Sequence, residues 1–205
     1  PYNLSQVDKA KRKLKNIALQ YLMQSDGKEA LEICYKQFLN SDNMTDCVAS
    51  LGALVNSNNE ERQKALSIFY SRWEDDPLVI DKWFSLQAIS EREGTIDEVI
   101  RLSSHPSFTL KNPNRLRSLV NVFSLLNQVR FHQADGRGYE FLADKIIEVD
   151  KINPQNAARM MAPLSRWKKL DKARQKLIKM QLEKIKYEKN LSQDVSEIVS
   201  KSISQ

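Results

Sequence analysis

Three dipeptides constrain the fold of this 205-residue chain most strongly: Asp76-Pro77, Asn112-Pro113 and Asn153-Pro154. An Asp or Asn side chain caps the free N–H groups at the start of a helix, and proline suits the first helical turn, where no N–H partner is lost. Each dipeptide therefore predicts a helix that begins at its proline. Because the chain must restart a helix at each of these points, we expect many short helices.

Apolar residues recur with helical periodicity between these starts, whereas β-type alternation and hairpin signals do not occur. Ser5 is expected to cap the first helix, which Asp26-Gly27 should end, and Thr95 is expected to cap a later one. The remaining helices are expected at about 28–39, 45–55, 60–73 and 171–189, at 192–203, and from positions 77, 113, 139 and 154.

About eleven short helices joined by short loops predict an all-α fold without a sheet. We expect an irregular α-solenoid, a superhelical stack of antiparallel helices, although no fixed-length repeat is visible. Residues 1–205 are expected to form a single domain, with two closely fused helical halves as the alternative. Cys34 and Cys47 are expected to be reduced core residues.

No apolar run reaches the roughly 20 residues that span a bilayer, and no signal peptide is visible, so we expect a cytoplasmic protein. The first residue is Pro1 and not methionine. We therefore expect a processed chain or a piece of a longer polypeptide.

The net charge of +6 comes from one segment, residues 166–189, which holds ten basic and three acidic residues. Helical spacing of its apolar residues favours a solvated outer face. Nucleic-acid binding is the less favoured alternative, because only Trp167 and Tyr187 offer rings for base stacking.

Catalytic and metal-binding patterns are missing from the sequence. The only histidines, His105 and His132, belong to no His-Glu-x-x-His motif and have no ligand spacing to the cysteines. Asp135-Gly136-Arg137-Gly138 lacks the lysine of a phosphate loop and instead predicts a turn before a helix. We therefore expect neither a catalytic residue nor a metal ligand.

Arginines near the Asn-Pro starts are the candidate binding residues. Arg115, Arg117 and Arg159 follow helix N-termini, where the dipole disfavours cations, so a nearby anion is expected. Arg117 also begins a polar stripe with Asn121 and Ser124 that is suited to a wet concavity. Spacing alone favours the alternative, in which the arginines pair with acidic residues between helices.

His132 is expected to lie at a helix end and to form a hydrogen bond with the turn at Asp135.

Five ordered segments resemble a known family: NMTDCVASLGALVN, FYSRWEDDPLVIDKWFSLQA, HPSFTLKNPNRLRSLVNVF, FHQADGRGYEFLADKI and NPQNAARM. They are similar to the C-terminal domain of bacterial aminopeptidase N, a family of zinc-dependent aminopeptidases. The resemblance is closest over residues 43–205 and extends to the leading helices of residues 1–42.

This resemblance implies a helical domain that caps the catalytic domain and lines a substrate chamber with its access channel. The parent enzyme would remove N-terminal amino acids from peptides with zinc held in another domain, so this chain alone is expected to be inactive. The implied partners are the other domains of its own polypeptide and peptide substrates, without a membrane, in a monomeric protein.

The same resemblance places Arg117 and Arg159 at the chamber, in contact with peptide, and so reverses the preference for ion pairs at these two positions. Asn121 and Ser124 are expected at the chamber wall, and Asn114 at the wall or in the scaffold around it. Arg115 and His132 remain scaffold. The alternative function is a free-standing helical-repeat scaffold that binds RNA or an acidic partner through residues 166–189.

Overall fold

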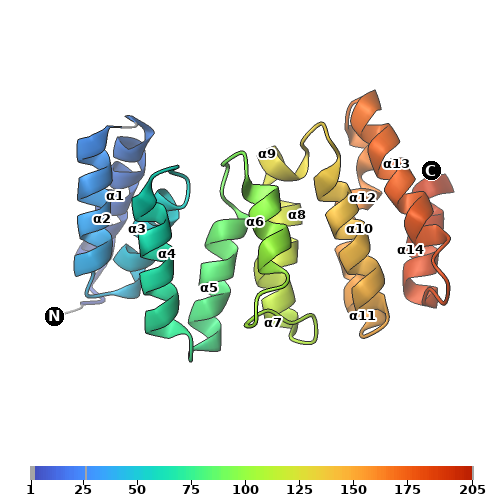
Figure 1. Cartoon of the computed structure of the whole chain (residues 1–205), viewed down its shortest axis with the longest axis horizontal. Helices are drawn as coiled ribbons and strands as arrows, with labels where there is room; N and C mark the ends of the chain where they lie inside the picture. The colour runs from blue at the N-terminus through green and yellow to red at the C-terminus, as the bar shows by residue number, and fades with distance from the viewer. Residues whose placement is uncertain (1–2, 26, 205) are drawn as a thin grey trace. The chain divides into compact units, whose positions relative to one another are not determined.

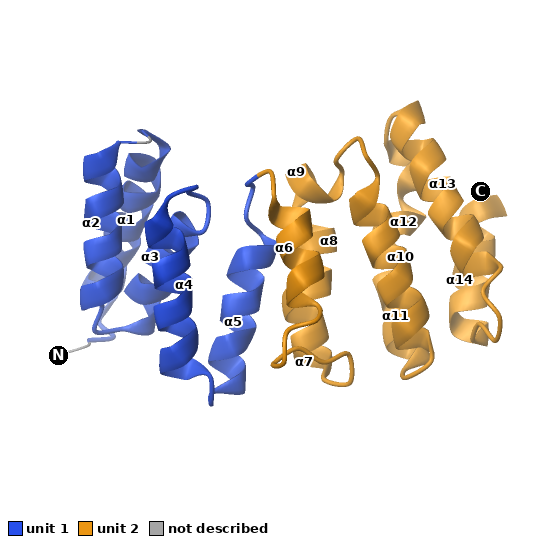
Figure 2. Cartoon of the chain, viewed as in Figure 1, with its two compact units in different colours: residues 1–92 blue, residues 93–205 orange. Residues whose placement is uncertain are grey.

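The computed structural model describes residues 3–25 and 27–204, and every regular element within them is a helix (Figure 1). The all-α prediction is therefore confirmed. Asp26, half of the turn expected after the first helix, lies outside the described residues. The chain divides into two compact units, residues 1–92 (unit 1) and 93–205 (unit 2) (Figure 2). The single-domain expectation stays a prediction.

Unit 1 is built around a central helix, α3, which packs against the other four helices of the unit. The sequence explains this position, because Cys47, Leu51 and Leu54 of α3 are all buried. The helices are α1 (Gln6–Leu22), α2 (Lys28–Asn40), α3 (Met44–Leu54), α4 (Glu60–Trp73) and α5 (Pro77–Ala88), with a 3-10 turn at Met23–Ser25.

Unit 2 has α10 against α11 and α13, and α14 against α11, α12 and α13. Phe123, Phe131 and Tyr139 are fully buried, and their rings meet edge to face with centroids 5.3 to 5.8 Å apart. The helices are α6 (Thr95–Leu102), α7 (Pro113–Leu116), α8 (Val122–Leu126), α9 (Gln128–Phe131), α10 (Arg137–Asp150), α11 (Pro154–Met160), α12 (Ala162–Ser165), α13 (Lys172–Lys186) and α14 (Gln193–Ser204).

The Asx-Pro helix starts are confirmed. Asp76 Oδ1 accepts hydrogen bonds from the amides of Leu78 and Val79 at 3.0 and 3.2 Å. Asn112 and Asn153 cap α7 and α11 in the same way. The expectation for Thr95 is wrong, because Thr95 is the first residue of α6 and Gly94 occupies the cap position.

More helical pieces are present than the roughly eleven expected. The helix that begins at Pro113 is interrupted by a π-helical turn, Arg117–Asn121, and α9 and α12 are short helices that periodicity did not indicate. Pro163 cannot donate a backbone hydrogen bond, which is consistent with the break between α11 and α12.

The turn before α10 requires glycine at two positions, one for its backbone conformation and one for close packing. Gly136 has φ 74°, in the left-handed region that favours glycine. A β-carbon at Gly138 would lie 2.4 Å from the carbonyl oxygen of Phe131, so only glycine fits there. The predicted turn is confirmed, although α10 begins at Arg137 and not at Tyr139.

The remaining general expectations concern the cysteines and membranes. Cys34 and Cys47 are free and buried, as expected, and burial raises the pKa of the Cys34 thiol to about 12. None of the helices in the described part of the chain has the length and apolar character to cross a bilayer.

Candidate functional site

The candidate site residues lie on and around the π-helical turn of unit 2. Leu116, Leu119 and Phe123 face the core. Each π turn adds a residue relative to an α turn and so rotates the residues after it about the helix axis. Consequently the predicted polar stripe is not continuous: Arg117 is exposed, Asn121 is half-buried, and Ser124 is buried.

Arg117 and Arg159 share an unusual environment. Both side chains are exposed, and within residues 3–25 and 27–204 neither makes a hydrogen bond or an ion pair. The ion-pair alternative therefore does not hold for these two arginines. Arg115 differs from them because its side chain is buried, with 6% of its surface exposed.

The capping residues occupy backbone N–H groups that could otherwise bind an anion at the starts of α7 and α11. Asn112 Oδ1 already accepts hydrogen bonds from the amides of Asn114 and Arg115 at 3.0 and 3.3 Å. Asn153 Oδ1 accepts from the amide of Asn156 at 3.0 Å. Because these N–H groups are engaged, an anion near either helix start would be bound chiefly by a guanidinium group.

Asn121 carries an unsatisfied polar atom. Its Oδ1 is buried and accepts no hydrogen bond from any described residue. Leaving a buried acceptor unpaired costs about 1–3 kcal/mol. Asn121 therefore combines two features that are common at binding sites, a π-helical backbone and an unmet hydrogen-bonding requirement.

His132 ends α9, as a scaffold residue would, but the expected bond to the Asp135 turn is wrong. Its Nδ1 lies 2.9 Å from the hydroxyl oxygen of Tyr139, and its carbonyl accepts a hydrogen bond from Arg174 at 2.7 Å. Burial, together with the charge of Arg174, lowers the pKa of His132. Both effects favour the neutral form of the ring.

Ser124 contributes to a pocket of about 160 Å³ in unit 2. Two basic residues that spacing did not connect with Ser124 also line this pocket, Arg166 and Lys169, together with His132. They follow Ser124 by some forty positions, so no local pattern indicated the contact. Arg117, Asn114, Asn121 and Arg159 are not among the residues that line this pocket, so it contains only Ser124 of the predicted contact and wall residues.

The basic segment forms α13 and the turn before it. Ile178, Leu182 and Ile185 are buried, and most of the lysines are exposed. Trp167 Nε1 donates a hydrogen bond to the carbonyl of Ser202 at 2.9 Å, which ties this ring to α14. This arrangement agrees with the expectation that residues 166–189 present a solvated outer face.

No group of three or more His, Cys, Asp or Glu side chains in residues 3–25 and 27–204 is arranged to hold a metal ion.

Residues 1–204 match the family described as "Domain of unknown function (DUF3458_C) ARM repeats". The chain belongs to this DUF3458_C family. Armadillo repeats are α-solenoids made of stacked helices, so the predicted fold class is confirmed. The match also includes the leading residues 1–42, where the resemblance had been expected to be weaker.

The relatives of this DUF3458_C chain are aminopeptidases. It is 39% identical over 193 residues to Aminopeptidase N of Caulobacter vibrioides, covering 94% of this chain and 22% of that protein. Identity is 39% over 203 residues with the Haemophilus influenzae Aminopeptidase N and 38% over 202 with that of Escherichia coli; each match covers 98% of this chain and 23% of the relative.

Among solved structures, aminopeptidase A of Legionella pneumophila in complex with aspartic acid matches with a TM-score of 0.89 and 34% identity. That match covers 94% of this chain and 23% of the other. The resemblance expected from the sequence is therefore confirmed, and the chain spans less than a quarter of the relatives' length.

Proposed function

We propose that this chain is the C-terminal helical domain of a cytoplasmic, monomeric zinc aminopeptidase that removes N-terminal amino acids from peptides. In this proposal the domain caps the catalytic domain and lines the substrate chamber and its access channel. The observation that carries the proposal is a likeness of 38–39% over nearly the whole chain to three proteins named Aminopeptidase N, each about four times longer.

Zinc would be bound elsewhere in the parent enzyme. The described residues of this chain do not fit the ion, because they bring no three ligand side chains together. Zinc supplies an activated water for peptide-bond hydrolysis when it is bound in such enzymes. The residues of this chain would bind and orient the peptide, and the isolated chain would be inactive.

Arg117 and Arg159 are the proposed peptide contacts. Both guanidinium groups are exposed and have no partner among residues 3–25 and 27–204, so they are free to bind the C-terminal carboxylate or the carbonyls of a short peptide. Asn121, whose side-chain oxygen is buried and accepts no hydrogen bond from the described residues, is proposed as a wall residue. Asn114 and Ser124 are proposed as further wall residues.

Arg117→Ala and Arg159→Ala in the complete enzyme test this role. We expect kcat/KM for peptides of three to six residues to fall roughly three- to tenfold, because each variant removes a charge-assisted contact. Turnover of an amino-acid anilide, which has no peptide C-terminus, should stay unchanged. Steady-state kinetics across peptide lengths measures both quantities.

Lys179→Ala is the matched control, since Lys179 is an exposed cation on α13. It should leave both substrate classes unaffected. Peptide-length profiles of the arginine variants that coincide with the unsubstituted enzyme would overturn the contact role. Absence of aminopeptidase activity from the complete, zinc-loaded protein would overturn the proposed function itself.

The alternative, an RNA- or acid-binding scaffold that acts through residues 166–189, gains no specific support. One of its two candidate stacking rings, Trp167, is hydrogen-bonded to α14. Salt-sensitive retention of the chain on immobilised RNA would favour this alternative over the peptidase domain.

A further inference from the structure

The pocket of about 160 Å³ in unit 2 holds two cations without a partner in the described part of the chain. Arg166 follows α12, and Lys169 ends the 3-10 turn Trp167–Lys169. Both side chains are exposed, and neither makes a hydrogen bond or an ion pair with residues 3–25 or 27–204. None of the described residues that line the pocket is acidic. The pocket therefore carries two positive charges that its own walls do not neutralise.

Asp171 follows this segment directly, but its carboxylate is engaged elsewhere. Its Oδ1 accepts hydrogen bonds from the amides of Ala173 and Arg174, both at 3.1 Å, and so caps α13. Its Oδ2 accepts one from Arg174 Nη1 at 2.7 Å. The charges of Arg166 and Lys169 are consequently left for an anion from outside the chain.

Ser124 brings an unpartnered hydroxyl to the same pocket. It lines the pocket although only 3% of its surface is exposed. Other serines of unit 2 donate to a backbone carbonyl, as Ser118 does to Arg115 at 2.8 Å and Ser165 does to Met161 at 3.1 Å. The hydroxyl of Ser124 makes no such bond with any described residue. Because a buried hydroxyl without a partner costs free energy, a ligand that accepts its proton would relieve that cost.

His132 adds a second neutral donor to the pocket. Its Nδ1 lies 2.9 Å from the hydroxyl oxygen of Tyr139, and Arg174 donates a hydrogen bond to the same hydroxyl. The proton of Tyr139 therefore points to Nδ1, and the neutral ring of His132 carries its own proton on Nε2. No described residue accepts a hydrogen bond from this Nε2. The Nε2–H group is thus available to a ligand.

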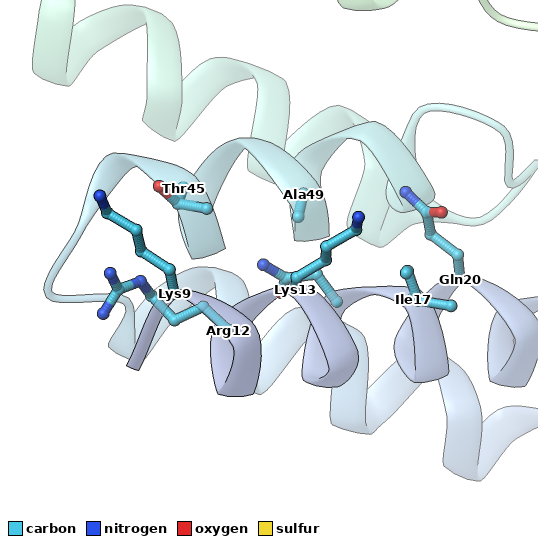
Figure 3. Close-up of a pocket in the computed structure, with 8 residues that line it drawn as sticks. Lys9, Arg12, Lys13, Ile17, Gln20, Thr45 and Ala49 are labelled. Carbon is cyan, nitrogen blue, oxygen red and sulfur yellow. The ribbon is translucent and has the colours of Figure 1, made fainter. Parts of the chain in front are cut away.

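The larger groove of unit 1, about 480 Å³ between α1 and α3, lacks this combination (Figure 3). Arg12 and Lys13 make that groove basic as well. Its buried Asn16, however, is satisfied: Nδ2 donates to Asp46 and Oδ1 accepts from Gln37, each at 2.9 Å. Exposed cations occur on any basic surface, whereas cations beside a buried hydroxyl without a partner indicate a site for a ligand.

We propose that the pocket of unit 2 binds a phosphate group, either as free phosphate or as a small phosphate monoester. Arg166 and Lys169 would bind its oxygens from one side, and Ser124 and His132 would donate to them from the other. Two positive charges match the charge of nearly −2 that a phosphate monoester carries at neutral pH. This inference goes beyond the proposed function and does not depend on it.

The shape of the pocket favours phosphate over a carboxylate and over a large ligand. A planar carboxylate is satisfied by one guanidinium fork, whereas a tetrahedral phosphate accepts hydrogen bonds from several directions. A volume of about 160 Å³ is well below the roughly 300 Å³ at which sites for drug-sized ligands begin. The apolar lining of Leu125, Pro163 and Leu170 leaves room for the small carbon group of an ester.

Calorimetric titration of the complete polypeptide and of the 205-residue chain with inorganic phosphate, methyl phosphate and acetate tests the site. Lys169→Gln should weaken both phosphate ligands about tenfold, because it removes a charge-assisted contact. Ser124→Ala should weaken them about threefold, because it removes a neutral donor. Acetate should bind at least about tenfold more weakly than phosphate, since it carries half the charge.

Lys168→Gln is the matched control. It removes the same charge from the adjacent position, where the ammonium group lies over the Trp167 ring, 5.5 Å from its centroid, and does not line the pocket. We expect it to weaken phosphate by less than about twofold, because exposed charges outside the site are screened by salt.

Equal losses in Lys168→Gln and Lys169→Gln would overturn the inference, because they would show diffuse attraction to a basic face. Acetate binding as tight as phosphate binding would also overturn it, as would binding to the 205-residue chain that disappears in the complete polypeptide. Either phosphate ligand binding the more tightly supports the site and identifies the source of the phosphate group. Failure here with intact peptide hydrolysis leaves the proposed function standing.

Discussion

Helices α1 and α14 have similar amphipathic sequences and opposite environments. In α14, Val195 and Val199 are fully buried, while Glu197 and Lys201 pair with each other on the exposed side. In α1 the apolar stripe formed by Val7, Leu14 and Tyr21 is exposed, and the buried positions are Asn16 and Leu19. Hydrophobic periodicity therefore identifies the residues that share a face of a helix, and the contacts within each unit decide whether that face is buried.

The two helices also differ in how they are attached. Asp150 accepts a hydrogen bond from the amide of Ser192 at 2.8 Å and so holds the start of α14, whose apolar face then fills the core. Asp46 binds α1 through Lys15 and Asn16, beside the buried Leu19. In α14 two buried valines face the core, whereas in α1 one buried leucine is joined by a charged hydrogen-bonding network.

Val199→Asp should have the largest effect in the 205-residue chain. It buries an unpaired carboxylate in α14, and we expect the free energy of unfolding to fall by about 4 kcal/mol or more. Tyr21→Asp, on the exposed stripe of α1, should change the free energy by less than about 0.5 kcal/mol. Urea denaturation measures both values. A comparable loss in the two variants would mean that the α1 stripe is buried.

Asp46→Ala should have an intermediate effect, about 2 kcal/mol, because it removes the hydrogen bonds that hold α1. Hydrogen exchange should locate the loss in α1 and leave α14 protected. A uniform loss of protection across both helices would contradict a separate polar attachment.

The network of Asp46 also predicts a pH dependence. Burial alone would raise the pKa of Asp46, but hydrogen bonds from Lys15, Asn43 and Asn16 lower it below its ordinary value. The stabilisation is therefore complete above the unfolded pKa of about 4 and disappears as the pH falls through the lower, folded pKa. Exchange of α1 should accelerate in that acidic range relative to α14, and Asp46→Asn should remove this difference.

Ser5→Ala should have a smaller effect than Asp46→Ala. Ser5 Oγ accepts a hydrogen bond from the amide of Asp8 at 3.1 Å, so its removal should destabilise the start of α1 by about 1 kcal/mol. The first turn of α1 should exchange several-fold faster. Ser192→Ala tests the corresponding cap of α14, where Ser192 Oγ accepts from the amide of Val195 at 3.3 Å. If neither variant increases local exchange, these caps do not limit fraying.

Local chemistry predicted the helix starts well, because an Asx cap and a following proline act within one turn. Asp76, Asn112 and Asn153 all cap as expected. The candidate site was predicted less well. The π-helical turn rotates Ser124 into the interior, and Tyr139 replaces the Asp135 turn as the partner of His132. Both outcomes depend on how α8, α9 and α10 pack.

The sequence by itself determined the all-helical composition, most of the helix starts and the likeness to aminopeptidases, since these depend on local patterns and on ordered segments. Only the tertiary structure decided that Arg117 and Arg159 are exposed, with no partner in the described part of the chain, and that α1 turns its apolar stripe outward. The physical reason is that periodicity defines which residues share a face of a helix. The rotation of that face is set by distant contacts, here by the carboxylate of Asp46.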